Sequence, residues 1–181
     1  EEALFAGVDA FLAKPLFAGS IREEIRDILA GRKKYKKAVS GVSLTGRKIL
    51  LAEDSDINAQ IVRQILLMKG VDSDIARNGR ETVELFQKSA RDSYDAVLMD
   101  IRMPEMDGLE AARQIRSLER ADARRIPIIA LTANAFEEDV NLSLEAGMNA
   151  HLTKPIEPDV LFATLENILS ISGNGREVTE Q

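Results

Sequence analysis

The chain has 181 residues, 45% of them hydrophobic, which suits one ordinary domain with some additional segments. Its formal net charge of −6 at pH 7 argues against nucleic acid as a direct partner. It contains no cysteine, which excludes disulfides and thiolate metal sites, and no apolar run approaches the roughly 20 residues of a membrane helix. We therefore expect a cytoplasmic location without membrane contact.

The beginning of the chain repeats a later part of it. Residues 1–30 align without a gap with residues 141–170. The identical pairs include Ala6 and Ala146, Lys14 and Lys154, Pro15 and Pro155, and Ile28 and Ile168. We interpret residues 1–30 as the C-terminal remnant of an upstream domain whose complete second copy follows. The apolar side chains of this remnant would lack the sheet on which they normally pack. We therefore expect the remnant to dock on the complete domain, to be disordered, or to pair with the same segment of a second molecule. The last option, a homodimer, is the one we favour.

A basic stretch separates the remnant from the complete copy. Residues 31–46 contain five basic side chains, Arg32, Lys33, Lys34, Lys36 and Lys37. Such a cluster can bind nucleic acid or acidic lipid, but this one is short and lacks a partner motif. It is interpreted as a solvated linker. The complete domain is predicted at residues 47–170, and residues 171–181 form a polar tail.

Strand and helix patterns alternate along the complete domain. Strand-length apolar runs lie at Lys48–Ala52, Val71–Ala76, Val97–Met99, Ile126–Leu131 and Asn149–Thr153. Helical spacing follows each run, at Ile57–Leu66, Thr82–Ser89, Leu109–Ile115, Phe136–Ala146 and Pro158–Ser170. This alternation predicts a five-stranded parallel sheet with helices on both faces. The functional site of such a sheet lies at the carboxyl ends of its strands.

Five polar residues follow these strands directly: Glu53, Asp54, Asp100, Thr132 and Lys154. Each alone has an ordinary structural explanation, such as a helix cap or a surface lysine. Together they would meet at one edge of the sheet. Three converging carboxylates repel one another unless a cation joins them, and oxygen ligands with waters suit Mg²⁺.

Asp100 is the natural nucleophile of this set, because a carboxylate can accept a phosphoryl group as an acyl phosphate. Transfer then depends mainly on positioning and charge neutralisation. Magnesium can neutralise one side of the phosphoryl group and Lys154 the other. The hydroxyl of Thr132 can donate a hydrogen bond to a phosphoryl oxygen.

Four motifs in the right order, over about 120 residues, make this chain resemble the response-regulator receiver family. They are Lys48–Asp54, Tyr94–Gly108, Ile128–Asn134 and His151–Pro155. The resemblance implies a flavodoxin-like, doubly wound sheet of order 2-1-3-4-5, with Asp100 as phosphoacceptor and Thr132 and Lys154 beside it. It further implies metal ligation by Glu53, Asp54, Asp100 and the Arg102 backbone carbonyl. Thr132 and His151 would form the conformational switch.

A finer likeness is to receivers of hybrid sensor histidine kinases, carried by Ala52–Asn58 and Leu131–Ala135. Such kinases can carry tandem receivers, which fits the repeat. The likeness implies a phosphorelay in which a phosphohistidine-bearing kinase or phosphotransfer domain is the partner. The chain has no pattern typical of a kinase domain, so we expect it to catalyse only its own aspartyl phosphorylation and dephosphorylation.

Three other functions compete with this interpretation. A haloacid-dehalogenase-type phosphohydrolase would place a second aspartate two residues after the nucleophile, where this chain has Arg102. A flavodoxin-like flavin binder would need a glycine- or hydroxyl-rich phosphate loop, where this chain has the acidic Glu53–Asp56. A scaffold that never takes phosphate has no need of the complete residue set.

Overall fold

The computed structural model describes residues 42–133 and 137–171 of the chain. The remnant predicted at residues 1–30, with the homodimer expected from it, lies outside these described residues. So do residues 31–41 of the predicted linker and residues 172–181 of the predicted tail.

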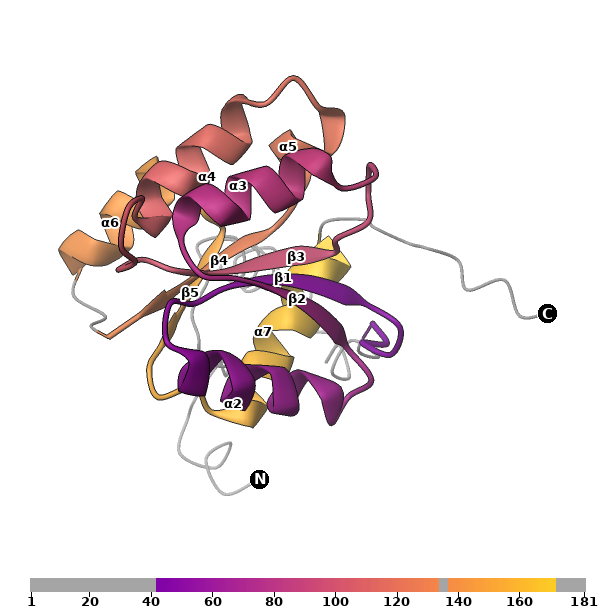
Figure 1. The fold of residues 1–181 in the computed structure, drawn as a ribbon. Helices are drawn as coiled ribbons and strands as arrows, with labels where there is room; N and C mark the ends of the chain where they lie inside the picture. The colour runs from indigo at the N-terminus through magenta and orange to yellow at the C-terminus, as the bar shows by residue number, and fades with distance from the viewer. Residues whose placement is uncertain (1–41, 134–136, 172–181) are drawn as a thin grey trace, which may run out of the picture. The chain divides into compact units, whose positions relative to one another are not determined.

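The described residues form a five-stranded sheet with helices on both faces (Figure 1). The strands are β1 Lys48–Ala52, β2 Asp72–Ala76, β3 Ala96–Asp100, β4 Ile128–Thr132 and β5 Ala150–Thr153. The helices are α2 Asp56–Leu67, α3 Gly79–Lys88, α4 Gly108–Ser117, α5 Ala121–Arg125, α6 Glu137–Glu145 and α7 Pro158–Ile171. Neighbouring strands are parallel in the order β2-β1-β3-β4-β5, so the predicted fold class is confirmed.

The short helix α5 was not predicted from the sequence. It has only five residues and its sequence, ADARR, offers no apolar repeat. The fourth strand was expected to begin at Ile126, but β4 begins at Ile128. Ile126 instead terminates α5, where its N–H donates to the carbonyl of Asp122, and the following Pro127 has no N–H to contribute to a sheet.

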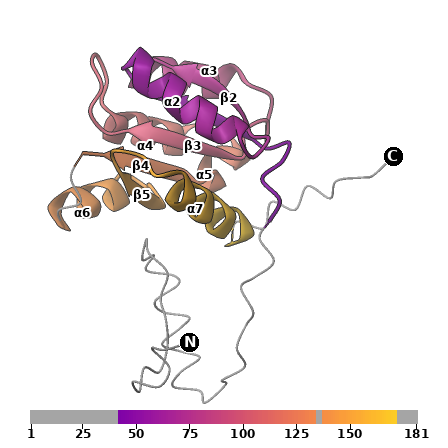
Figure 2. The ribbon, with the colours of Figure 1, turned by 90° about the horizontal axis from the view of Figure 1, so that it is seen from below.

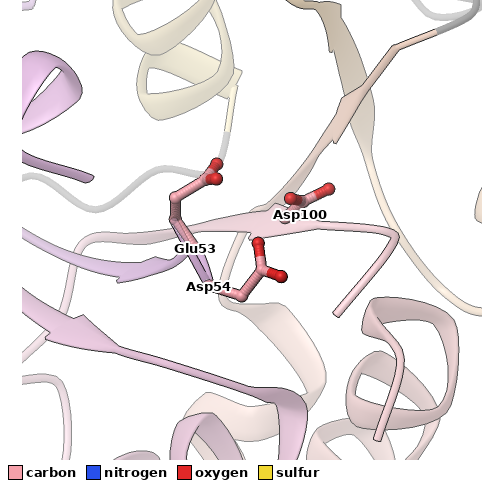
Figure 3. Close-up of side chains that lie close together, drawn as sticks. All are labelled: Glu53, Asp54 and Asp100. Carbon is pink, nitrogen blue, oxygen red and sulfur yellow. The ribbon is translucent and has the colours of Figure 1, made fainter. Parts of the chain in front are cut away.

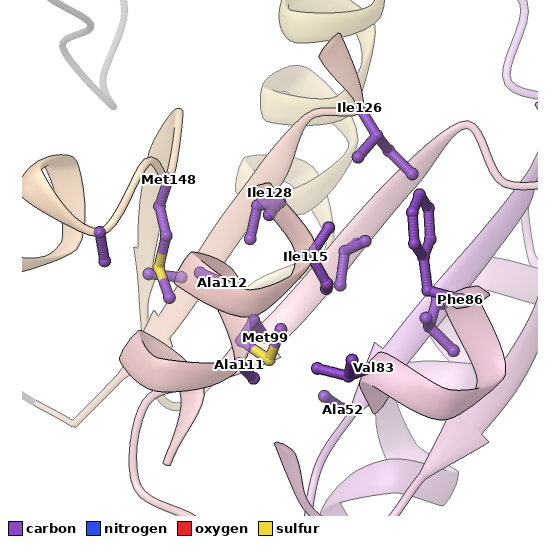
Figure 4. Packing of buried hydrophobic residues seen from close by; sticks show 14 of the residues in the cluster. Ala52, Val83, Phe86, Met99, Ala111, Ala112, Ile115, Ile126, Ile128 and Met148 are labelled. Carbon is purple, nitrogen blue, oxygen red and sulfur yellow. The ribbon is translucent and has the colours of Figure 1, made fainter. Parts of the chain in front are cut away.

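Each face of the sheet packs against its own set of helices. On one face, a buried cluster joins β1, β3 and β4 to α3, α4 and the turn before β5 (Figure 4). Its members include Met99, Ile115, Ile128, Phe86 and Met148. Strand side chains alternate between faces, and the other face is covered by α2 and α7, which lie nearest the viewer in Figure 2. Both faces are therefore dry, as a parallel sheet requires.

Helix α2 turns a different face inward from the one its isoleucines suggest. Its buried residues are Ala59, Val62, Ile65 and Leu66. Ile57 and Ile61 are 72% and 52% exposed, because at about 100° per residue Ile57 lies roughly 200° around the helix from Ala59. The predicted helix exists, but two of the four apolar residues that indicated it lie at the surface.

The loop after β3 is fixed closely against the end of that strand. Asp107 begins α4 by accepting a hydrogen bond from the Glu110 N–H at 2.8 Å, and Gly108 donates its N–H to the Ile101 carbonyl at 2.9 Å. A β-carbon added to Gly108 would lie 2.2 Å from the Asp100 carbonyl oxygen. Only glycine therefore allows α4 to begin this near the strand end that carries Asp100.

The close approach at Gly108 predicts that Gly108→Ala lowers the free energy of unfolding by about 1–3 kcal/mol, the usual cost of overpacking. Helix propensity alone would predict the opposite sign, since alanine is favoured over glycine by about 1 kcal/mol. Urea unfolding of the two proteins measures the difference. A variant as stable as the parent, or more stable, would contradict the close packing.

Candidate functional site

The three acidic residues singled out in the sequence lie at one edge of the sheet. Glu53 and Asp54 follow β1, and Asp100 ends the neighbouring β3, whose Met99 pairs in register with Ala52. Figure 3 shows their side chains gathered at these two strand ends. One carboxylate oxygen from each residue lies within 4.8 Å of the others. The parallel register therefore produces the convergence that the sequence predicted.

A single ammonium group joins two of these carboxylates. The Lys154 Nζ lies 2.6 Å from Glu53 Oε2 and 2.6 Å from Asp100 Oδ2. Lys154 is held at the end of β5, where its backbone N–H donates to the Thr132 carbonyl at 2.8 Å. The peptide bond between Lys154 and Pro155 is cis. Glu53 and Asp100 lie 101 and 54 positions before Lys154 in the sequence, and they meet at its ammonium group.

Glu53 and Asp54 have opposite surroundings although they are adjacent. Glu53 is only 1% exposed, and its Oε1 accepts a hydrogen bond from Asn58 Nδ2 at 3.1 Å. Asp54 is exposed. The helix α2 that follows has one residue as its N-terminal cap. The structure assigns it to Ser55, whose side chain accepts from the Asn58 N–H. Asp54 is therefore not needed to cap α2.

Burial and charge pull the protonation of Asp100 in opposite directions. Burial raises the pKa of the Asp100 carboxyl, and the negative charge of Glu53 adds to this. The hydrogen bond and charge of Lys154 lower the pKa, as does the Arg102 N–H, which donates to Asp100 Oδ1 at 3.1 Å. The raising effects win. One ammonium group therefore does not fully compensate the buried carboxylate.

Lys154 shows the complementary balance. Burial lowers the pKa of its ammonium group, but the hydrogen bonds to Asp100 and Glu53 and their negative charges outweigh burial, so the pKa is raised. Lys154 therefore stays charged at neutral pH. Three carboxylates and one ammonium leave the cluster negative, and such a cluster can attract a cation.

The remaining predicted residues lie around this cluster. Thr132 is buried at the end of β4, one strand from Asp100. Arg102 follows Asp100 with an exposed side chain. His151 is half-buried on β5 opposite Ala130, and burial lowers the pKa of its imidazole. Thr132 is thus close to the acidic cluster along the sheet edge, whereas His151 lies three residues before Lys154 on the outer strand.

Sequence reasoning missed the role of Asn58 beside Glu53. Its side chain comes from the first turn of α2, three residues beyond the N-cap Ser55 and about one turn from the acidic pair. Asn58 ends the stretch Ala52–Asn58 that resembles hybrid receivers, but that likeness gave its side chain no role in a site. Only the choice of N-cap could have indicated this role. With Ser55 as the N-cap of α2, Asn58 lies on the side of the helix near Glu53.

A family model for the response regulator receiver domain matches residues 49–166. The chain belongs to this family. The receiver match covers the five strands, apart from Lys48 at the start of β1, and the three carboxylates, and it agrees with the resemblance found in the four sequence motifs.

Several known proteins similar to this receiver are histidine kinases. Hybrid signal transduction histidine kinase I of Dictyostelium discoideum is 38% identical over 129 residues, which are 70% of this chain and 7% of that protein. Probable histidine kinase 1 of Oryza sativa subsp. indica is 34% identical over 151 residues, which are 67% of this chain and 15% of that protein. The chain thus spans only a small part of these relatives.

Solved structures show the same fold. The receiver domain of a sensor histidine kinase from Pseudomonas aeruginosa, solved with a magnesium ion coordinated in its active-site cleft, has 37% identity and a TM-score of 0.63. It matches 70% of this chain and 99% of that chain. The receiver of a histidine kinase from Syntrophus aciditrophicus has 33% identity and a TM-score of 0.63, over 75% of this chain and 98% of that one.

Among the described residues, no helix is long and apolar enough to span a membrane.

Proposed function

We propose that this receiver accepts a phosphoryl group on Asp100 from a phosphohistidine, as a step of a two-component phosphorelay. The observation that carries this proposal is the pair of 2.6 Å contacts from Lys154 to Asp100 and Glu53. A buried carboxylate with a paired cation on one side and further acidic groups on the other has the parts that phosphoryl transfer needs.

In the proposed reaction, a carboxylate oxygen of Asp100 attacks the phosphorus of the donor. A phosphorus–oxygen bond forms, and the phosphorus–nitrogen bond to the donor imidazole breaks with its electron pair going to nitrogen. The ammonium of Lys154 lies close enough to Asp100 to form an ion pair with the phosphoryl oxygens after transfer. The hydroxyl of Thr132, from the neighbouring strand end, donates a hydrogen bond to one of them.

The acidic cluster fits a magnesium ion by the chemistry of its donors. Three carboxylates with oxygens within 4.8 Å offer hard oxygen ligands and excess negative charge. Asp54, Asp100 and the Arg102 backbone carbonyl would hold the ion directly, and buried Glu53 through a water. When bound, magnesium would neutralise part of the negative charge on the phosphoryl oxygens.

Phosphorylation is expected to change partner binding through Thr132 and His151. A phosphoryl group on Asp100 would draw the Thr132 hydroxyl toward it and bias the chain after β4. His151, half-buried on the adjacent strand β5, would then change its exposure in a two-state population shift.

The relatives support a larger setting for the receiver. We infer that the parent protein is a hybrid sensor histidine kinase in the cytoplasm, with residues 1–30 as the end of an upstream receiver. Its donor would be a phosphohistidine-bearing kinase or phosphotransfer domain. A homodimer through residues 1–30 remains a prediction.

The surface beside the acidic cluster supports a protein donor. Ile57 and Ile61 are exposed on α2, the helix that begins two residues after Asp54. A hollow of about 110 Å³ is lined by residues that flank Lys154 in the sequence, Leu152, Thr153, Pro155, Ile156, Glu157 and Val160. Apolar side chains around a charged centre suit a donor that covers the site and excludes water. We therefore infer that the donor docks on the α2 isoleucines.

Asp100→Asn should abolish incorporation of phosphate from acetyl phosphate with magnesium, because the amide cannot form an acyl phosphate. Intact-protein mass spectrometry measures the added phosphoryl group, and acid lability with base sensitivity identifies its type. Normal labelling of the Asn variant at another residue would refute Asp100 as the acceptor. Glu110→Gln, an exposed acidic residue on α4, is the matched control and should label normally.

Ile57→Ser should slow transfer from a phosphohistidine donor by roughly tenfold, the effect of losing an apolar anchor of about 1.4 kcal/mol. The rate with acetyl phosphate should stay unchanged, because a small donor needs no docking surface. Leu144→Ser on α6, 49% exposed in the parent, is the control for general loss of apolar surface. Equal rates for Ile57→Ser and the parent with the protein donor would contradict docking on α2.

A further inference from the structure

Glu53 is the most enclosed member of the acidic cluster, and both of its oxygens have donors. Its side chain is 1% exposed. Lys154 Nζ binds Oε2 at 2.6 Å, and Asn58 Nδ2 binds Oε1 at 3.1 Å. A buried carboxylate is costly unless its charge is matched and its lone pairs are used. These two donors therefore determine how Glu53 can point.

The two donors differ in how firmly they can hold Glu53. Lys154 also binds Asp100 at 2.6 Å, and in the proposed reaction its ammonium follows the phosphoryl group. Asn58 makes no other side-chain hydrogen bond among the described residues, and its backbone N–H is fixed to the Ser55 cap. An asparagine has one short, stiff side chain at a fixed place on the first turn of α2. Asn58 is thus the constant support of Glu53.

We propose that Asn58 is a positioning residue of the cation site, which orients the Glu53 carboxylate so that it can accept hydrogen bonds from waters of a bound divalent cation. This rests on the proposed metal-dependent function. Because Glu53 Oε1 accepts a hydrogen bond from Asn58 on α2, the carboxylate of Glu53 keeps the same orientation when Lys154 moves away. Without Asn58, the carboxylate follows Lys154, and the cation loses an oriented partner.

Calorimetric titration of the whole chain with Mg²⁺ tests the proposal. Asn58→Leu removes the amide at nearly constant size and favours the helix, and it should weaken Mg²⁺ binding by roughly tenfold. Asn58→Ala, which also lacks the donor, should behave alike. Gln60→Leu, an exposed amide of the same helix, should bind as the parent does. In a Glu53→Gln background, Asn58→Leu should have no further effect, because the carboxylate that it positions is absent.

The outcomes separate the alternatives. A merely structural role would lower the melting temperature without the metal and leave the Mg²⁺ affinity unchanged, and that result overturns the proposal. An equal loss of affinity in the Glu53→Gln background also overturns it, because Asn58 would then act by another route. If the parent chain binds Mg²⁺ and takes phosphate but Asn58→Leu matches it, only the positioning role fails. If the parent binds no Mg²⁺, the metal step of the proposed function fails, and the positioning role with it.

Discussion

The ammonium group of Lys154, shared between Glu53 and Asp100 at 2.6 Å from each, is the interaction on which the edge of this sheet depends. Three strand ends deliver acidic or basic side chains to one place. Without a cation, the buried Glu53 and the largely buried Asp100 would carry adjacent like charges in a poorly hydrated setting. Lys154 makes this arrangement tolerable, yet it leaves the cluster negative. The pKa of Asp100 is raised because Lys154 only partly compensates for the burial of this carboxyl and for the charge of Glu53.

The same incomplete compensation connects the fold to the proposed chemistry. A site that was neutral in its resting state would have little attraction for a divalent cation. A site without Lys154 would have no positive group to meet the phosphoryl oxygens. The fold supplies both at low cost, because β1, β3 and β5 are parallel and bring their acidic or basic residues to the same edge of the sheet. Gly108 adds a steric condition, since α4 begins almost in contact with the backbone of Asp100.

Much of this could be predicted from the sequence. The alternation of apolar runs and helical spacing predicted the sheet, and residues directly after strands predicted the cluster, since the strand ends fix where a parallel sheet gathers its polar groups. Details set by side-chain geometry could not be predicted. Ile57 and Ile61 matched the period of a helix, but the period alone does not say which stripe faces the sheet. Asn58 gained its role only through the direction of its side chain toward Glu53, and α5 was too short to show a period.

Lys154 and a divalent cation share partners at this site, because both are attracted to the carboxylates of Asp100 and Glu53. The most direct test is the Mg²⁺ affinity of Lys154→Met compared with that of the parent chain, measured by calorimetry at neutral pH. Removing the competing ammonium should strengthen Mg²⁺ binding, by roughly tenfold for the loss of one nearby positive charge at a partly hydrated site. Unchanged or weaker Mg²⁺ binding by Lys154→Met would contradict the shared acidic site.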